Sequence, residues 1–194
     1  MNRKENQRIR LTKTLLKSSL MDRMASKPVS KITIKEICEN AGINRSTFYL
    51  YYKDQFELLN EVESELLHLA EQHLKKIDSN ENNLHYLKEL LGYIKDNSAH
   101  FRILLCHPES LSFQTRFVDI SIRNLKHNIS LNCPEPISDY VFRYLTIGCL
   151  SMITKWMESD FDLPVEELTR LIFGLSDSAL AIFDKPGERL NSID

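Results

Sequence analysis

Hydrophobic positions recur at intervals of three and four residues along most of the chain. Near the N-terminus, Leu16, Leu20 and Met24 follow this spacing, with basic residues between them. Such spacing gathers the apolar side chains on one face of an α-helix. The pattern predicts a first amphipathic helix that ends before the sequence SKPVSK.

The same spacing predicts helices over the rest of the chain. Two short helices are expected within residues 33–52, and a long helix is expected after Asp54, where Asp54 and Glu57 form a capping-box pattern. Alternation with a period of two, which indicates a strand, does not persist anywhere in the sequence. The sequence predicts an all-α fold of about nine helices, with a small N-terminal domain over residues 1–53 and a larger helical domain over 54–194. The last five helices are expected near residues 84–94, 99–106, 110–131 and 138–158 and after Pro164.

Two helix caps flank one glycine in the sequence TIKEICENAGINRSTFY. Thr33 and Glu36 form a capping box, and Asn44 is placed to cap a second helix. Gly42 lies between them, where a left-handed residue can end the first helix. Two short capped helices joined by a glycine turn have the layout of a helix-turn-helix. Cys38 falls where these helices would cross, which predicts a small buried side chain.

The second of these helices carries side chains that suit a DNA groove. Residues 45–47 (Arg-Ser-Thr) supply one cation and two hydroxyls in its first turn, which can reach base edges and phosphates. Tyr49 and Tyr52 are expected to hydrogen-bond phosphate oxygens from the surface. Phe48 and Tyr51 are expected to face the core.

Charge divides the chain into a basic head and an acidic body. Residues 1–53 carry twelve Lys and Arg against four acidic residues, although the formal net charge of the whole chain is −2. This asymmetry indicates a polyanionic partner for the head. A basic face that is simply solvated is the alternative.

Membrane, secretion and enzyme signals are missing from the sequence. No run approaches the roughly 18 apolar residues of a membrane span, and the N-terminal MNRKENQRIR has no apolar segment behind its charges. The four cysteines are irregularly spaced and are most simply reduced thiols in a cytoplasm. A Gly-rich phosphate loop, G-x-S-x-G and HExxH are also missing, so no catalysis and no cofactor are expected.

The segment TIKEICENAGINRSTFYLYYKDQFELL resembles the N-terminal DNA-binding segment of the TetR (tetracycline-repressor) family, over roughly residues 8–62. The turn glycine, the caps and the Thr-Phe-Tyr helix occur together in register. Members of this family are mostly homodimeric repressors whose C-terminal helical domain binds a small molecule or a dimer partner. The resemblance implies a palindromic DNA operator. With the capping and aromatic positions above, it gives a DNA-binding set of Thr33, Asn44, Arg45, Ser46, Thr47, Tyr49, Tyr52 and Lys53.

The chain departs from the family pattern at two positions. Gln55 replaces the lysine that usually follows the Tyr-Phe pair, so a phosphate contact is lost there unless Lys53 supplies it. This replacement favours an alternative function, a protein-binding adaptor or coactivator on the same scaffold. Cys38 replaces the usual alanine and leaves a thiol or redox sensor open.

The segments YIKDNSAHFRILL and GCLSMITKWMESDFDLPVEELTRLI are similar to the C-terminal domain of the DhaS-like branch of this family. In the family, the last two helices pair with their copies in a four-helix dimer bundle. An ordinary intramolecular core is the alternative. The resemblance implies a homodimer interface that includes Gly148, Met152, Leu168, Leu171, Ile172 and Leu175.

Large side chains in the body could either line a pocket or fill the core. If they line a pocket, its ligand would be a mainly apolar small molecule. Cys106, His107 and His100 match no standard zinc spacing, so no metal site is expected. The pocket candidates are Phe101, Leu105, Phe113, Phe117, Tyr140, Tyr144 and Trp156.

Overall fold

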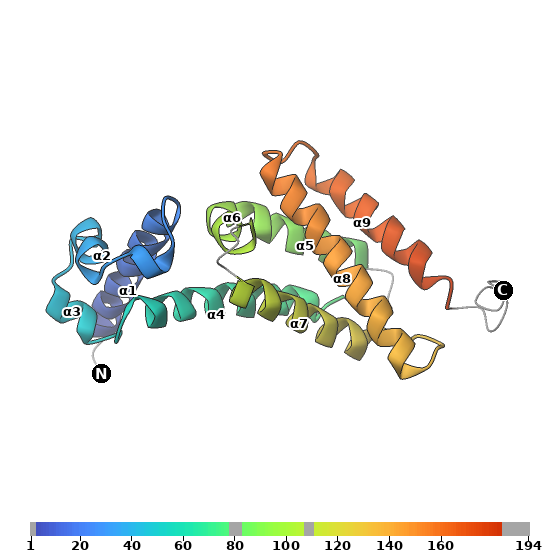
Figure 1. Cartoon of the computed structure of the whole chain (residues 1–194), viewed down its shortest axis with the longest axis horizontal. Helices are drawn as coiled ribbons and strands as arrows, with labels where there is room; N and C mark the ends of the chain where they lie inside the picture. The colour runs from blue at the N-terminus through green and yellow to red at the C-terminus, as the bar shows by residue number, and fades with distance from the viewer. Residues whose placement is uncertain (1–2, 78–82, 107–110, 184–194) are drawn as a thin grey trace. The chain divides into compact units, whose positions relative to one another are not determined.

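The computed structural model describes residues 3–77, 83–106 and 111–183, and these residues form helices joined by turns (Figure 1). Nine α-helices, one short 3-10 helix and no strand occur in these ranges, which confirms the predicted all-α fold. The helices are α1 (Arg3–Met24), η1 (Val29–Lys31), α2 (Ile34–Ala41), α3 (Arg45–Tyr49), α4 (Gln55–Leu74), α5 (Asn83–Asp96), α6 (Ser98–Cys106), α7 (Leu111–Asn128), α8 (Glu135–Glu158) and α9 (Val165–Leu180).

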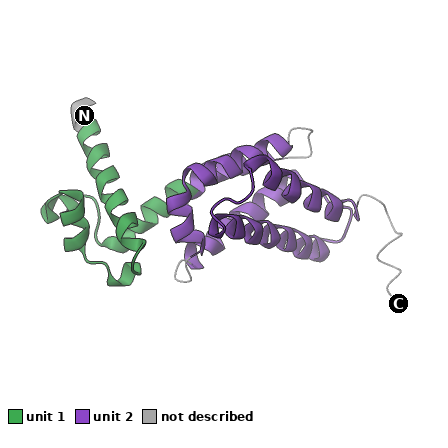
Figure 2. Cartoon of the chain, turned by 90° about the horizontal axis from the view of Figure 1, so that it is seen from above, with its two compact units in different colours: residues 1–66 green, residues 67–194 purple. Residues whose placement is uncertain are grey.

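The chain forms two compact units, residues 1–66 and 67–194 (Figure 2). The boundary between these units falls within α4, whereas the sequence placed a domain boundary after residue 53. The first part of α4 is joined to α1 by ion pairs. Lys13 Nζ lies 3.0 Å from a carboxylate oxygen of Glu61, and Lys17 Nζ lies 2.5 Å from one of Glu65. Although burial opposes it, hydrogen bonds from Lys17 and Lys13 lower the pKa of Glu61.

The first unit is built around one small apolar core. Leu16 and Leu20 of α1, Ile37 of α2 and Phe48 of α3 are fully buried there. The hydroxyl of Ser19 donates a 2.8 Å hydrogen bond to the backbone oxygen of Ile37, which joins α1 to α2 across this core. Apolar packing and one buried hydrogen bond therefore both hold α2 of the helix-turn-helix against α1.

The second unit packs α5 against α9, and α8 against α6 and α7. A row of aromatic rings joins three of these helices: successive rings of Tyr93, Phe101, Phe113 and Phe117 have centroids 5.6–6.3 Å apart. At the end of α8, the indole nitrogen of Trp156 donates a 2.7 Å bond to the backbone oxygen of Leu163. These contacts form a core around α6, α7 and α8.

Among the described helices, none has the length and apolar character that crossing a membrane requires.

Candidate DNA-binding head and ligand cavity

The start of α2 is fixed by the predicted capping box. The hydroxyl oxygen of Thr33 accepts the backbone N–H of Glu36 at 3.3 Å, and the Glu36 carboxylate accepts the Thr33 N–H at 2.9 Å. Lys27 Nζ lies 2.5 Å from the same carboxylate. Hydrogen bonds from Lys27 and from Thr33 lower the pKa of Glu36 from 4.5 to about 2. The Thr33 hydroxyl is thus engaged in the cap while the residue itself is exposed.

The turn between α2 and α3 depends on Gly42. Its φ of 66° and ψ of 29° lie in the left-handed region, as predicted for the end of α2. The next N–H, of Ile43, donates to the Cys38 backbone oxygen at 2.9 Å. The Cys38 side chain is 3% exposed, in agreement with its predicted position, and burial raises the pKa of its thiol. This turn sets the direction in which α3 leaves α2.

Helix α3 exposes the residues that the sequence assigned to DNA. Arg45 and Ser46 are exposed, Thr47 is half-buried and the Tyr49 ring is 52% exposed. Asn44 is the N-cap residue by position, but its side chain makes no capping hydrogen bond, contrary to expectation. One exposed surface therefore carries a cation, two hydroxyls and an aromatic ring.

Tyr52 does not belong to this surface, contrary to the expectation that its hydroxyl contacts a phosphate. Its side chain is 2% exposed, packs at 5.7 Å from the Phe48 ring and has Lys13 Nζ 5.2 Å from its own ring centroid. Burial, with the nearby Glu61 carboxylate, raises the pKa of its hydroxyl. Tyr51, expected in the core, is half-buried instead.

The head also presents cations that have no ion-pair partner among the described residues. Lys31, Arg45 and Lys53 are exposed and make no ion pair with any residue in the described ranges. By contrast, Lys35 pairs with Glu39 at 3.8 Å. These three cations are therefore available to an anionic partner, although several other lysines of the head serve internal pairs.

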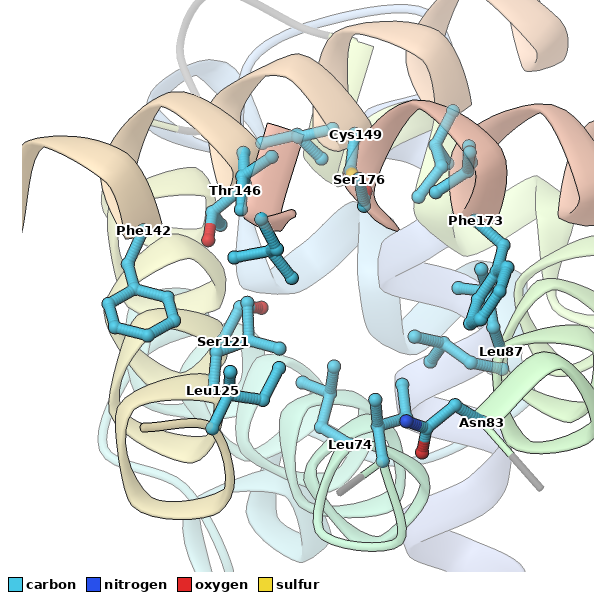
Figure 3. A pocket seen from close by; sticks show the side chains of 18 of the residues that line it. Leu74, Asn83, Leu87, Ser121, Leu125, Phe142, Thr146, Cys149, Phe173 and Ser176 are labelled. Atoms are coloured by element: carbon cyan, nitrogen blue, oxygen red, sulfur yellow. The ribbon is translucent and has the colours of Figure 1, made fainter. Parts of the chain in front are cut away.

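A cavity of about 180 Å³ lies within the second unit (Figure 3). Its wall comes from the end of α4 and from α5, α7, α8 and α9, and it is largely aliphatic. The side chains that carry polar atoms are Asn83, Ser121, Thr146, Cys149, Ser176 and Asp177. The apolar lining is Leu74, Ile77, Leu87, Leu90, Phe117, Leu125, Ile129, Phe142, Leu145, Leu150, Ile153, Ile172, Phe173 and Leu180.

The polar positions of the cavity differ in how they are paired. The Ser121 hydroxyl donates to the Phe117 backbone oxygen at 2.8 Å, and Cys149 Sγ lies 3.7 Å from the Ser176 hydroxyl. Burial raises the pKa of the Cys149 thiol, which keeps it neutral. Thr146 is 5% exposed, and its buried hydroxyl oxygen has no hydrogen-bond partner in the described part of the chain.

Of the seven side chains expected to line a pocket, Phe117 does so. Phe101, Leu105, Phe113 and Trp156 are buried but lie outside this cavity, in the core around α6. The other two, Tyr140 and Tyr144, are 78% and 75% exposed on α8. Small polar residues on otherwise apolar helix faces, such as Ser121 and Thr146, are the only hint of this cavity in the sequence, and Thr169 shows the same pattern outside it.

The residues expected at a dimer interface include both exposed and buried side chains. Leu171 and Leu175 are 45% and 57% exposed on α9, Gly148 is exposed and Met152 is half-buried. The other two, Leu168 and Ile172, are each 2% exposed within the same chain. These two therefore belong to the interior of this unit rather than to a surface available to a partner.

The thiols and histidines form no metal cluster among the residues that the structure describes. All four cysteines are free, and burial raises the pKa of the Cys106 thiol. His107, which the sequence placed beside Cys106, lies outside the described residues.

The comparisons with known proteins agree with this architecture. A family model described as the transcriptional regulator C-terminal region (TetR_C_8) matches residues 81–178, just over half of the chain. The chain is 23% identical over 185 residues to YxbF of Bacillus subtilis (strain 168), an uncharacterized HTH-type transcriptional regulator. That match covers 90% of this chain and 48% of YxbF, so the chain spans about half the length of this relative.

Two solved structures share the fold. A TetR transcriptional regulator from Streptococcus agalactiae 2603V aligns with a TM-score of 0.63 and 23% identity, over 89% of this chain and 97% of that chain. The dihydroxyacetone kinase operon activator DhaS aligns with a TM-score of 0.57 and 19% identity over the same shares. The latter agrees with the DhaS-like character of the C-terminal segments.

A capped helix-turn-helix followed by an all-helical second unit is the architecture of helix-turn-helix transcriptional regulators. Since the family model covers half of the sequence, the chain belongs to the TetR family of transcriptional regulators. Proteins of this class are regulators rather than enzymes.

Proposed function

We propose that this protein is a homodimeric repressor that binds a palindromic DNA operator through α3 and is released by a small-molecule effector. The observation that carries the proposal is the exposure of Arg45, Ser46 and Tyr49 on a short helix whose opposite side is fixed by the buried Phe48. A rigidly held helix with exposed polar groups can enter a major groove without losing order.

Phosphate contacts would supply much of the affinity for DNA. Lys31 and Lys53 are exposed beside α2 and α3. Thr33 is exposed at the start of α2, where its N–H and hydroxyl are already bonded to Glu36, so it would contact a phosphate only by exchanging these bonds. Base contacts then fall to Arg45, Ser46 and Tyr49, because these project from the groove-facing helix. Gln55 is half-buried and is left out of the set.

A homodimer is supported by the apolar surface of α8 and α9. Tyr144 and Ile147 of α8 and Leu171 and Leu175 of α9 are between 45% and 75% exposed. Contiguous exposed apolar side chains of this kind mark interaction surfaces. A two-fold dimer would also present two α3 helices about 34 Å apart, one DNA turn, which a palindrome requires.

Effector control is supported by the cavity and by the course of α4. Leu74, near the end of α4, lines the cavity, whereas Glu61 and Glu65 of the same helix pair with α1. An effector that binds better to a conformation with weak DNA affinity would lower operator occupancy by that preference. All four cysteines are thiols, which suits action in the cytoplasm.

Selection of bound duplexes from a random DNA pool tests the proposal directly. We expect an enriched palindrome whose affinity falls steeply with salt, with a logarithmic slope of about −0.9 for each neutralised phosphate. Failure to enrich any sequence at low salt, from a folded dimer, would contradict DNA recognition.

Replacing Tyr49 tests the recognition helix. Tyr49→Ala should weaken operator binding about two- to tenfold, because a single hydrogen bond contributes about 0.5–1.5 kcal/mol. Dimerisation should be unchanged, since Tyr49 lies in the first unit. Fluorescence anisotropy with the selected duplex measures the affinity. The buried Phe48 is unsuitable as a control, so Tyr86→Ala in the second unit serves instead, and equal effects of both changes would remove Tyr49 from the site.

A protein-binding adaptor or coactivator is the second candidate function. It is favoured by Gln55 and by the structural likeness to DhaS, which is described as an operon activator. Stable capture of a defined protein partner, together with no specific duplex, would support this candidate over the repressor.

A further inference from the structure

We propose that the cavity of the second unit takes a small, uncharged, mostly apolar molecule with one hydroxyl or carbonyl group, and that Thr146 binds this group. The regulatory consequence rests on the proposed effector control, whereas the ligand chemistry rests on the cavity alone. Thr146 projects from α8 into the ring of side chains around the cavity, near Phe142 (Figure 3).

The size of the cavity limits the ligand. Its volume of about 180 Å³ lies below the roughly 300–1,000 Å³ of sites for drug-sized molecules. Apolar cavities of about 150 Å³ admit benzene and otherwise stay dry. A molecule with one ring, or an aliphatic chain of similar volume, therefore matches this space, and its apolar part would contact leucine, isoleucine and phenylalanine side chains.

Thr146 supplies the polar contact because its hydroxyl is buried and unpaired. Serine and threonine in helices commonly donate to the backbone oxygen four residues earlier. Ser121 donates in this way to Phe117 at 2.8 Å, and Thr169 to Val165 at 2.6 Å. The Thr146 oxygen makes no such bond within the described residues. A buried hydroxyl without a partner is costly, so a ligand that pairs with it gains affinity.

The electrostatics of the wall exclude anions. Asp177 is the one charged side chain among the described residues that line the cavity, and neither lysine, arginine nor histidine lines it there. A carboxylate would lose its hydration without gaining a cation, which is strongly unfavourable. Asp177 would also repel it. The Cys149 thiol is neutral, so it adds no negative charge to the wall of the cavity.

Three probes with one ring separate these contributions: benzyl alcohol, toluene and benzoate. They share a skeleton and differ in the polar group. We expect titration calorimetry of the full chain, without DNA, to detect benzyl alcohol and toluene but not benzoate. Binding of benzoate at least as tightly as benzyl alcohol would overturn the proposal, and so would the failure of all three probes to bind.

A pair of matched variants assigns the polar contact. Thr146→Val keeps the shape and removes the hydroxyl, so benzyl alcohol should bind about tenfold more weakly while toluene binds as well as before. Thr169→Val makes the same change at a buried residue of α9 outside the cavity, and should alter neither affinity. Unchanged binding of benzyl alcohol to Thr146→Val would overturn the assignment.

Thiol labelling locates the bound probe in the unmodified protein. Cys149 lines the cavity, whereas Cys133 is half-buried and does not. Benzyl alcohol should slow the reaction of Cys149 with methyl methanethiosulfonate, followed by peptide mass, and leave Cys133 unaffected. Equal rates at Cys149 with and without the probe would place the probe elsewhere and overturn the proposal.

Operator binding is measured in a separate experiment, so a failure of the ligand proposal can be distinguished from a failure of the proposed DNA-binding function. If benzyl alcohol binds through Thr146 but leaves operator affinity unchanged, effector control of the DNA-binding function by this ligand class is contradicted while the ligand chemistry stands. If the probe also lowers operator affinity, and does so less in Thr146→Val, both are supported.

Discussion

At the scale of single residues, two buried threonines of the second unit differ in one respect. Thr146 and Thr169 are 5% and 1% exposed on neighbouring helices, yet the Thr169 hydroxyl is hydrogen-bonded and the Thr146 hydroxyl is not. Natural cores seldom leave such a group unpaired. Its presence beside a cavity is the reason to treat Thr146 as a binding group rather than as part of the core.

This difference predicts opposite effects of one substitution on stability. Thr146→Val should raise the free energy of unfolding by about 1 kcal/mol, because it removes an unpaired buried hydroxyl, whereas Thr169→Val should lower it by about 1 kcal/mol. Urea unfolding of the ligand-free proteins measures both. A loss of stability in Thr146→Val equal to that in Thr169→Val would mean that the Thr146 hydroxyl is satisfied.

The capping carboxylate of α2 gives a prediction about pH. The folded pKa of Glu36 is about 2 against an ordinary 4.5, so its stabilising effect is present above 4.5 and is lost as the pH falls towards 2. Glu36→Gln should therefore be less stable than the unmodified protein near neutral pH, and the difference should shrink between pH 4.5 and 2. Thermal unfolding across this range measures it, and a constant difference would contradict the assigned pairing with Lys27 and Thr33.

The tyrosines show where residue-level prediction from sequence fails. The outward position of Tyr49 and the buried position of Phe48 follow from helical spacing, and the structure has both. The spacing fails for Tyr51 and Tyr52 because α3 ends at Tyr49. Beyond a helix end, the turn decides which way a side chain points, and the sequence pattern carried no signal for that end.

At the scale of elements, helices were predictable while the cavity was not. Apolar spacing and caps define where a helix lies and which face it buries, and these are local properties. Whether a buried face meets another side chain or an empty space depends on how five helices pack. Phe113 and Phe117 are one helical turn apart on the same face of α7, but Phe117 lines the cavity and Phe113 does not.

Two glycines, Gly42 in the turn between α2 and α3 and Gly92 in α5, should respond in opposite ways to replacement by alanine. Gly42→Ala should destabilise the protein by about 1–2 kcal/mol, because φ is 66° there, although a Cβ would meet no atom within 4 Å. Gly92→Ala, in the interior of α5 with equally open surroundings, should stabilise it by about 0.5–1 kcal/mol. Denaturant unfolding measures both changes. Equal effects would show that the backbone of Gly42 is not constrained.

At the scale of the whole molecule, the exposed cations of the proposed DNA surface and the apolar side chains of the proposed dimer interface belong to different units. The exposed cations Lys31, Arg45 and Lys53 belong to the first unit, whereas the exposed apolar residues of α8 and α9 belong to the second. The sequence carried the charge division as a simple count, but the surface available to a partner needed the structure. Leu168 and Leu175 follow one helical pattern on α9, yet the first is buried in the chain and the second is 57% exposed.

This exposed surface leads to a prediction about oligomeric state. Leu175→Lys should weaken the affinity of dimerisation at least about a hundredfold, since an unpaired charge buried in an interface costs several kcal/mol. The fold of the separate chain should survive, because Leu175 is already largely exposed within it. Leu111→Lys is the matched control, because Leu111 is 66% exposed on α7, outside the proposed interface. Sedimentation equilibrium over a concentration series distinguishes the two. If Leu175→Lys remains as dimeric as Leu111→Lys, the α8 and α9 surface does not join two copies, and the apolar residues exposed there would point to a different protein partner, as the adaptor function requires.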